Sequence, residues 1–544
     1  MRRRTFTILA VLFAFGAAGC DRPEEPPPPA RVTTLRIVHG PELRAYMSTM
    51  KERFSLSTPT LPDGTRLAVE LISELGVPAA RKLASGELKA EAWLAPSSSL
   101  VNFTNASIHG LGARQVDCIR LFGSPIVLVT RPEHLEYFNT RGQEFSWQEL
   151  YETKFAPTVG ETPDRSYLAY SHGNPDASTA GLEALLQLAW FARSGHEAVT
   201  VEALRSEPLR TKLREYESRV SGYSMSEAFL LERTALSGSK RIRFTITSEQ
   251  QLALFNQSRS EPGAPLVGLY PAEGSIWQDY HLCTSEADWV TPAHQAGLRL
   301  LAKLLAGEQA QREVQERGFR PFMVEAAQPA SPTSTRGVNL QHPRTSIAPV
   351  AGEVVKELLS TWGDLMRPSA VALVLDGSGS MEGEPLSFGK EHFRNLLARA
   401  PSRDLKALVS FSSEPRVEAP FTPDSASIIP LLDRIQPIGG SAVYDGLATA
   451  IELMTSPELN RYRKAIVLLT DGEDKNSSLG LQALLDLVNS KLTRYDINLM
   501  IVGVSREGVS YADLQKVARA ANGLFREAPP TRLGGVFQEV FKSL

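Results

Sequence analysis

Four apolar runs, each followed by a stretch with helical spacing, constrain the fold of the C-terminal part of the chain most strongly. The runs are VALVLD (371–376), LKALVSF (405–411), KAIVLLTD (464–471) and INLMIVGV (497–504), and LFRE (524–527) predicts a short further strand. Strands that are apolar at nearly every position are buried on both faces, and the helices between them supply the cover. The pattern therefore predicts an α/β domain built on a parallel sheet.

Two of these strands end in side chains that carry oxygen atoms. The first continues into Asp376-Gly377-Ser378-Gly379-Ser380, the third ends in Thr470-Asp471-Gly472, and Gly439-Gly440-Ser441 lies between them. Ligands of open parallel sheets bind at the carboxyl ends of the strands. Hydroxyls and carboxylates suit a hard cation such as Mg²⁺, which keeps waters when few acidic groups surround it. The competing interpretation is that the serines cap a helix and the aspartates are solvated.

The three segments together resemble the von Willebrand factor A domain and its metal-ion-dependent adhesion site. The DxSxS motif of that family corresponds to Asp376, Ser378 and Ser380, the TDG aspartate to Asp471, and the usual threonine is replaced by Ser441. The resemblance implies that the serines of the first segment bind Mg²⁺ (or Mn²⁺ or Ca²⁺) directly and that both aspartates act largely through water. It also implies that a carboxylate of a protein partner fills the open position.

The first residues of the chain indicate export. Arg2, Arg3 and Arg4 precede an apolar run that is too short to remain as a membrane anchor. The following AAGC resembles a bacterial lipoprotein signal (1–20), in which Cys20 is lipidated; cleavage of an ordinary secretory signal is the other interpretation. Residues 21–33, DRPEEPPPPARVT, predict a proline-rich tether. We expect a protein anchored by lipid to the bacterial membrane, on the periplasmic face or the cell surface.

A second segment rich in Pro, Ser and Thr divides the rest of the chain. Residues 326–350 have no hydrophobic period and predict an interdomain linker, between a first domain over 34–325 and a second over 351–544. A length of 544 residues is too great for one core. The formal net charge of -3 gives no electrostatic reason to expect a nucleic acid partner.

The first domain also alternates strands with helices. Four stretches resemble the two-lobed extracellular solute-binding proteins of bacteria: AEAWLAPSSSLV, HGNPDASTAGLEALLQL, GLYPAEGSIWQDYHLCTSEADWV and GEQAQREVQERGFRP. The resemblance implies two α/β lobes that hold a small solute in the cleft between them. The expected fold class is α/β: a two-lobed periplasmic-binding-protein-like domain followed by a doubly wound, Rossmann-like von Willebrand factor A domain.

Candidate solute ligands lie at the predicted junctions between strands and helices. Hydroxyls and helix N-terminal amides at such junctions can hold an anion or a polar solute. Most serines and threonines there are simple helix caps, which is the competing interpretation, and His39 fits a structural role better. The candidates are His39, Gly40, Ser97, Ser98, Ser99, Ser124, Ser178, Thr179 and Tyr270.

The cysteines offer one further hypothesis. If Cys20 is lipidated, Cys118 and Cys283 remain as an even pair outside the cytoplasm, where disulfides persist. The resemblance to solute-binding proteins places both on strands near the junction of the lobes. A Cys118–Cys283 disulfide is therefore one hypothesis, and two buried thiols are the other.

The predicted oxygen cluster favours binding over catalysis. No general base or nucleophile accompanies it in the sequence, so we do not expect an enzyme that uses Mg²⁺ for hydrolysis. The stretch GEPLSFGK (383–390) has one residue too many between its glycines for a phosphate-binding loop. We expect a membrane-anchored protein that binds a protein partner through Mg²⁺ and carries a solute-binding-like domain. The alternative is a substrate-binding lipoprotein of an ABC-type transporter with an auxiliary von Willebrand factor A domain.

Overall fold

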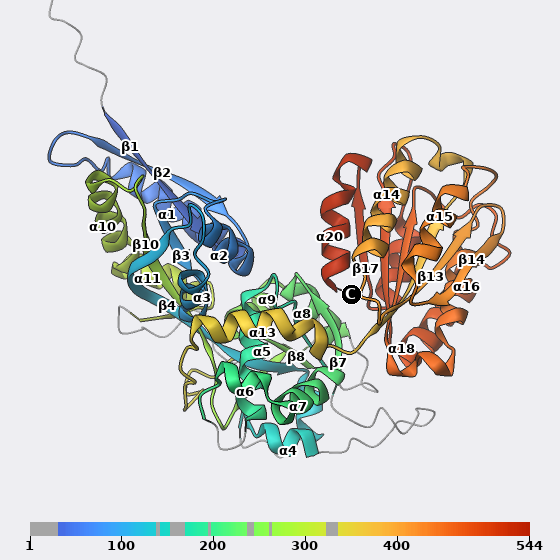
Figure 1. The fold of residues 1–544 in the computed structure, drawn as a ribbon, viewed down its shortest axis with the longest axis horizontal. Helices are drawn as coiled ribbons and strands as arrows, with labels where there is room; N and C mark the ends of the chain where they lie inside the picture. The colour runs from blue at the N-terminus through green and yellow to red at the C-terminus, as the bar shows by residue number, and fades with distance from the viewer. Residues whose placement is uncertain are drawn as a thin grey trace, which may run out of the picture.

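The computed structural model describes residues 31–137, 142–152, 169–193, 197–236, 244–259, 264–322 and 336–543. The predicted signal peptide with Cys20, most of the predicted tether and the first part of the predicted linker lie outside these residues. Within the described residues, no helix is both long enough and apolar enough to cross a membrane. The described residues form two α/β parts, drawn in blue to yellow and in orange to red in Figure 1.

The first part is built on one sheet of eleven strands. Its strands and longer helices are, in chain order, β1 (Val32–His39), α1 (Arg44–Leu56), β2 (Arg66–Ser73), α2 (Gly76–Ser85), β3 (Ala92–Ala95), α3 (Ser98–Ala106), β4 (Arg114–Thr130), β5 (Glu144–Phe145), α4 (Trp147–Glu152), β6 (Tyr170–Gly173), α5 (Thr179–Ala192), α6 (Val201–Arg205), α7 (Glu207–Ser218), β7 (Val220–Ser224), α8 (Glu227–Leu236), β8 (Phe244–Ser248), α9 (Glu249–Ser258), β9 (Val267–Pro271), β10 (Trp277–Glu286), α10 (Pro292–Ala306), α11 (Glu308–Glu316) and β11 (Arg320–Pro321).

The long strand β4 divides this sheet into two halves. Its residues 114–125 pair with β10, on the side of β1, β2 and β3, and its last residues pair with β8 and β9, on the side of β6 and β7. Figure 1 shows α1, α2, α10 and α11 around the first half and α5 to α9 around the second. Cys118 of β4 and Cys283 of β10 form a disulfide between adjacent strands, with their Cα atoms 4.0 Å apart.

The described end of the predicted linker is packed against the first part. Val338 and Ile347 are buried, the amide of Gly268 donates to the carbonyl of Gly337 at 2.9 Å, and the amide of Ile347 donates to that of Ser275 at 2.9 Å. The described residues 336–350 of the predicted interdomain linker (326–350) are therefore held against the first part. Their sequence lacks a hydrophobic period, but two apolar side chains and a few backbone hydrogen bonds hold them in place.

Helix α13 (Gly352–Leu365) also belongs to the first part. Its buried side chains Val355, Leu358 and Trp362 join the core formed by α2, α3 and α5. The helix packs against α3 of the first half and against α6 and α7 of the second (Figure 1). The boundary between the two parts therefore follows Leu365 rather than residue 350. The apolar face of the helix needs a partner surface, and it finds one in the preceding part of the chain.

The second part is a six-stranded sheet in the order β14-β13-β12-β15-β16-β17. Neighbouring strands are parallel except for the edge strand β14, which is antiparallel to β13. The elements are β12 (Ser369–Asp376), α14 (Glu384–Arg399), β13 (Leu405–Phe411), β14 (Pro415–Thr422), α15 (Ser425–Arg434), α16 (Val443–Met454), β15 (Arg463–Thr470), α17 (Leu481–Leu487), α18 (Thr493–Tyr495), β16 (Ile497–Val504), α19 (Ala512–Ala520), β17 (Leu524–Ala528) and α20 (Leu533–Ser543). Helices α14, α15 and α20 pack on one face, and α16, α17 and α19 on the other.

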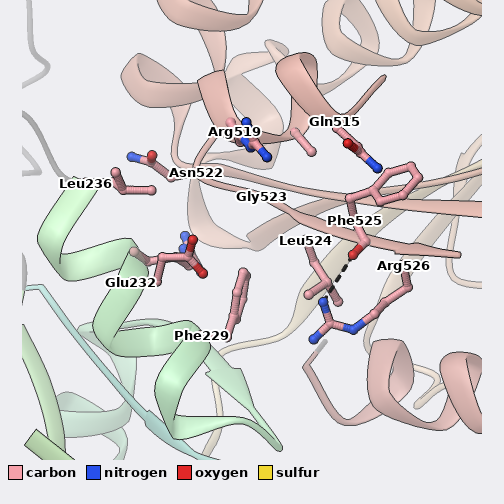
Figure 2. A pocket seen from close by; sticks show the side chains of 12 residues that line it. Phe229, Glu232, Leu236, Gln515, Arg519, Asn522, Gly523, Leu524, Phe525 and Arg526 are labelled. Atoms are coloured by element: carbon pink, nitrogen blue, oxygen red, sulfur yellow. Dashed lines mark hydrogen bonds between the residues drawn. The ribbon is translucent and has the colours of Figure 1, made fainter. Parts of the chain in front are cut away.

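The two parts touch through the edge of the first sheet. The guanidinium of Arg233 on α8 donates to Asn498 Oδ1 on β16 at 2.6 Å, and Asn498 Nδ2 donates to the carbonyl of Ser221 on β7 at 3.2 Å. Asn174 Nδ2 donates to the carbonyl of Lys542 on α20 at 2.8 Å. Figure 2 shows the small cavity of about 280 Å³ beside these contacts, between α8 and the α19–β17 connection.

Candidate metal centre

The strand order places the predicted oxygen cluster at one point of the second sheet. Strands β12 and β15 are neighbours, with Leu375 opposite Leu469, and they end at Asp376 and Thr470. The strand order reverses at this pair, because β13 and β14 follow on one side and β16 and β17 on the other. The loops after the two strands diverge there and leave room for a ligand. Asp376 is 0% exposed and Asp471 is 1% exposed.

The structure brings all five predicted metal ligands into one hydrogen-bonded cluster. Ser380 Oγ donates to Asp471 Oδ1 at 2.8 Å and lies 3.0 Å from Ser378 Oγ. Ser441 Oγ donates to Asp376 Oδ2 at 3.5 Å, and the amide of Ser378 donates to Asp376 Oδ1 at 2.8 Å. Ser380 is exposed, whereas the other four residues are buried, so the cluster opens to solvent on one side only.

Two residues of the cluster were not among the predicted ligands. Thr470 Oγ1 donates to Asp376 Oδ2 at 2.5 Å and accepts from the amide of Gly472 at 3.2 Å. Asn476 Oδ1 accepts from the amide of Ser441 at 3.1 Å. Thr470 has a recognisable signal, because it stands next to Asp471 at the end of a buried strand. Asn476 has none, because its loop takes a course that no periodicity predicts.

The loop before Ser441 depends on its two glycines. Gly439 has a φ of +83°, in the left-handed region that favours glycine. A Cβ atom on Gly440 would lie 1.8 Å from Asn476 Oδ1, so a larger residue there would displace the side chain that holds Ser441. These two glycines therefore let the backbone turn tightly beside the site.

The donor set fits a hard divalent cation. It consists of hydroxyl and carboxylate oxygens, which Mg²⁺ prefers, and it lacks nitrogen and sulfur. Among the described residues, no three His, Cys, Asp or Glu side chains form a group that could hold an ion, so a metal at this centre would depend on the serine hydroxyls. Burial raises the pKa of Asp376 to about 6, and hydrogen bonds from Ser378 and Thr470 offset part of that rise.

The raised pKa of Asp376 predicts that Mg²⁺ binding weakens in acid. The ion requires the carboxylate form, so protons compete with it below about pH 6, and we expect the affinity to fall about tenfold per pH unit there. The effect of the raised pKa on folding stability has the opposite dependence on pH. The raised pKa favours the protonated form of the folded chain, so its contribution to stability is full below about pH 4 and is lost by about pH 6. Calorimetric titration with MgCl₂ at pH 5, 6 and 7.5 measures the first effect; equal affinities would contradict it.

A cleft of about 690 Å³ lies in the first part, between its two halves. Pro41, Arg44 and Gly76 line it from the first half, and Ser178 and Thr179 from the second. Two of the predicted solute ligands, Ser178 and Thr179, therefore line the cleft. Ser178 also caps α5, since its Oγ accepts from the amide of Gly181 at 3.0 Å.

The other predicted solute ligands do not line this cleft. They are His39, Gly40, Ser97, Ser98, Ser99, Ser124 and Tyr270. Their polar groups are used within the fold: Ser97 Oγ caps α3, Ser124 Oγ accepts from the amide of Gln250 at 2.9 Å, and the Tyr270 hydroxyl donates to Glu249. A hydroxyl at a strand–helix junction satisfies helix amides first, and only some of these junctions face the cleft.

The cleft contains two half-buried carboxyl groups that sequence reasoning missed. The Tyr280 hydroxyl donates to Glu42 Oε1 at 3.0 Å, and burial raises the pKa of Glu42 to about 7. Ser178 Oγ donates to Glu227 Oε1 at 2.6 Å, and burial likewise raises the pKa of Glu227. The only sequence signal was their position in the first turn of a helix, where acidic residues are common.

The strand order and the oxygen cluster at its switch point define the second part as a von Willebrand factor A domain. Residues 370–538 match the family model of the von Willebrand factor type A domain. Domains of this family typically bind a divalent metal at such a site. The match covers the second part of the chain and leaves the first part outside it.

Similar proteins share limited parts of their length with this chain. The "Uncharacterized protein sll0103" of Synechocystis sp. is 31% identical over 115 residues, which are 21% of this chain and 27% of that protein. The "Inter-alpha-trypsin inhibitor heavy chain H4" of Homo sapiens is 29% identical over 170 residues, 29% of this chain and 18% of that protein. A solved "von Willebrand factor type A from Catenulispora acidiphila" is 22% identical over 32% of this chain and 42% of its own, with a TM-score of 0.29.

Proposed function

We propose that this chain is a non-catalytic binding protein whose von Willebrand factor A domain takes up Mg²⁺ and, through the ion, a carboxylate of a protein partner. The observation that carries the proposal is the single hydrogen-bonded cluster formed by Asp376, Ser378, Ser380, Ser441 and Asp471. Ser378, Ser380 and Ser441 would supply hydroxyl ligands, and the two aspartates would supply negative charge. When bound, the ion supplies an electrostatic anchor for a carboxylate.

The surroundings of the cluster support a role in partner binding. Ser380 and Gly379 are exposed beside the buried aspartates, which leaves the centre accessible from one side. Ile438 is 67% exposed, and its amide donates to the carbonyl of Gly377 at 3.0 Å, so a large apolar side chain stands at the rim. An exposed apolar residue beside a charged centre suits a protein partner, which can bury the apolar side chain and bind the charged centre.

We propose no catalytic role for the cluster. In the described part of the chain, its side-chain hydrogen bonds involve hydroxyls, carboxylates, backbone amides, the side-chain amide of Asn476 and one guanidinium. Such a set can hold an ion, but it includes no histidine or lysine beside the serine hydroxyls to activate one of them as a nucleophile, as in Ser–His pairs.

We further propose that the first part has the fold of two-lobed solute-binding proteins and that the chain is exported and held at the membrane by a lipid on Cys20. The cleft between the two halves supports the first statement, and the Cys118–Cys283 disulfide supports export, because disulfides persist outside the cytoplasm. The same cleft supports the alternative function, a substrate-binding lipoprotein of a transporter, in which the von Willebrand factor A domain is auxiliary.

Partner capture should depend on the metal. We expect the tagged chain, pulled down from detergent-solubilised membranes of its own cells in Mg²⁺, to retain a protein that EDTA releases. Added Mg²⁺ should restore its capture, because the ion bridges the two proteins. The measurement is the amount of that protein in eluates with Mg²⁺, with EDTA and with EDTA followed by excess Mg²⁺.

The matched control is the Ser441→Ala chain, which lacks one hydroxyl of the cluster and should retain little of the same protein in Mg²⁺. Retention that is equal in EDTA and in Mg²⁺ would contradict the proposal. A rise in melting temperature on addition of small solutes in EDTA would instead favour the transporter alternative, because the cleft does not require the ion.

A further inference from the structure

An arginine reaches into the oxygen cluster from a third strand. Arg506 lies two residues after the end of β16, the neighbour of β15, and so at the same edge of the sheet as Asp471. Its Nη1 donates to Asp471 Oδ2 at 3.2 Å and to the carbonyl of Ser380 at 3.3 Å. The side chain of Arg506 is 53% exposed, whereas that of Asp471 is 1% exposed.

This contact balances charge that the centre would otherwise leave uncompensated. A buried carboxylate is costly unless a positive group or several donors pair with it. Asp471 receives one hydrogen bond from Ser380 on Oδ1, and the guanidinium occupies the other oxygen, Oδ2. Arg506 therefore supplies, from within the chain, part of the positive charge that a divalent ion would bring.

We propose that Arg506 is an internal counter-ion of the centre that competes with the divalent ion for Asp471 and thereby sets the metal affinity. The inference rests on the proposed function, because it concerns the same site. Both contributions of Arg506 oppose the ion: its hydrogen bond occupies an oxygen of Asp471, and its charge repels a cation. A unit charge in contact with a ligand of the ion changes the affinity about tenfold even when water screens it well.

The test is the affinity of the purified full-length chain for Mg²⁺ alone, measured by calorimetric titration at physiological ionic strength. We expect Arg506→Ala to bind Mg²⁺ about tenfold more tightly than the wild type. Arg506→Lys keeps the positive charge and should bind about as the wild type does. Unchanged or weaker binding by Arg506→Ala would overturn the proposal, and so would an Arg506→Lys chain that binds as tightly as Arg506→Ala.

Arg399 provides a matched control. It is exposed at the last turn of α14, whose first turn lies near the cluster. Sixteen helical residues separate the two ends by roughly 22 Å, more than two Debye lengths at physiological salt. Arg399→Ala removes the same charge and should leave the Mg²⁺ affinity unchanged.

The stability of the metal-free chain gives a second readout. In EDTA, Arg506→Ala should melt below the wild type, because Asp471 loses its charged partner, and saturating Mg²⁺ should remove the difference. Equal melting temperatures in EDTA would overturn the counter-ion role. A wild-type chain that binds no Mg²⁺ would contradict the proposed function, whereas wild-type binding that Arg506→Ala leaves unchanged would contradict this inference alone.

Discussion

Asp376→Ala should reduce Mg²⁺ affinity at least about a hundredfold and abolish the rise in melting temperature that Mg²⁺ produces. Asp376 lies at the centre of the cluster: its carboxylate accepts from the amide of Ser378, from Thr470 Oγ1 and from Ser441 Oγ. Its removal takes away one of two negative charges and releases a hydroxyl from each of two other segments. The measurement is calorimetric titration with MgCl₂, together with melting curves with and without the ion.

Asp376→Asn separates loss of the charge from loss of the fold. The amide keeps the size of the carboxylate, so we expect a folded chain that has the same defect in Mg²⁺ binding. Because burial raises the pKa of Asp376 to about 6, its charged form is unfavourable in the metal-free protein at pH 7.5. Metal-free Asp376→Asn should therefore melt at or above the wild-type temperature. Asp486→Ala, on the exposed face of α17, is the control, and Mg²⁺ stabilisation of Asp376→Ala would contradict the proposed metal centre.

Loss of the disulfide between Cys118 and Cys283 should cost the first part of the chain about 3–5 kcal/mol of unfolding free energy. The bond closes a loop of 165 residues in sequence, and long loops gain the most from a cross-link in the unfolded state. The measurement is urea denaturation of the chain with both cysteines replaced by serine. A chain with two α/β parts need not unfold in one step, so the transition of the first part is the one to compare.

Reducing agent is the matched control for the disulfide. It should destabilise the wild type by a similar amount and leave the double serine variant unchanged. Mass analysis of the unreduced wild type that finds both thiols free would contradict the bond.

The sequence was most informative where strands are buried on both faces. The strands that end at Asp376 and Thr470 were predictable, because unbroken Val, Leu and Ile runs fit little else in an α/β chain. Their positions also predicted that the three oxygen-bearing segments would meet. The edge strand β14 was missed, because PRVEAPFT contains two prolines and alternates poorly. Helix α15 was missed for a related reason, since Pro430 lies inside it.

Contacts between distant segments were the least predictable. The pattern GEVVKELLSTWGDL predicts an amphipathic helix, but it does not say which part of the chain covers its apolar face. Arg506 is similar to other exposed arginines in the sequence, and only the parallel pairing of β15 with β16 brings it to Asp471. Among the serines that cap helices, nothing local distinguishes Ser178, which lines the cleft, from Ser97, which does not.

The connection between helix α13 and the second part of the molecule is very short. The helix packs against helices of both halves of the first part. Only residues 366–368 separate its end from β12, the strand that leads to Asp376. Three residues span at most about 11 Å, so this connection keeps the end of α13 close to the start of β12. Anyone who wishes to separate the two parts should cut within those three residues. A cut at 350 would separate α13 from the first part, against which it packs. The fragment with the von Willebrand factor A domain would then carry a helix with an exposed apolar face.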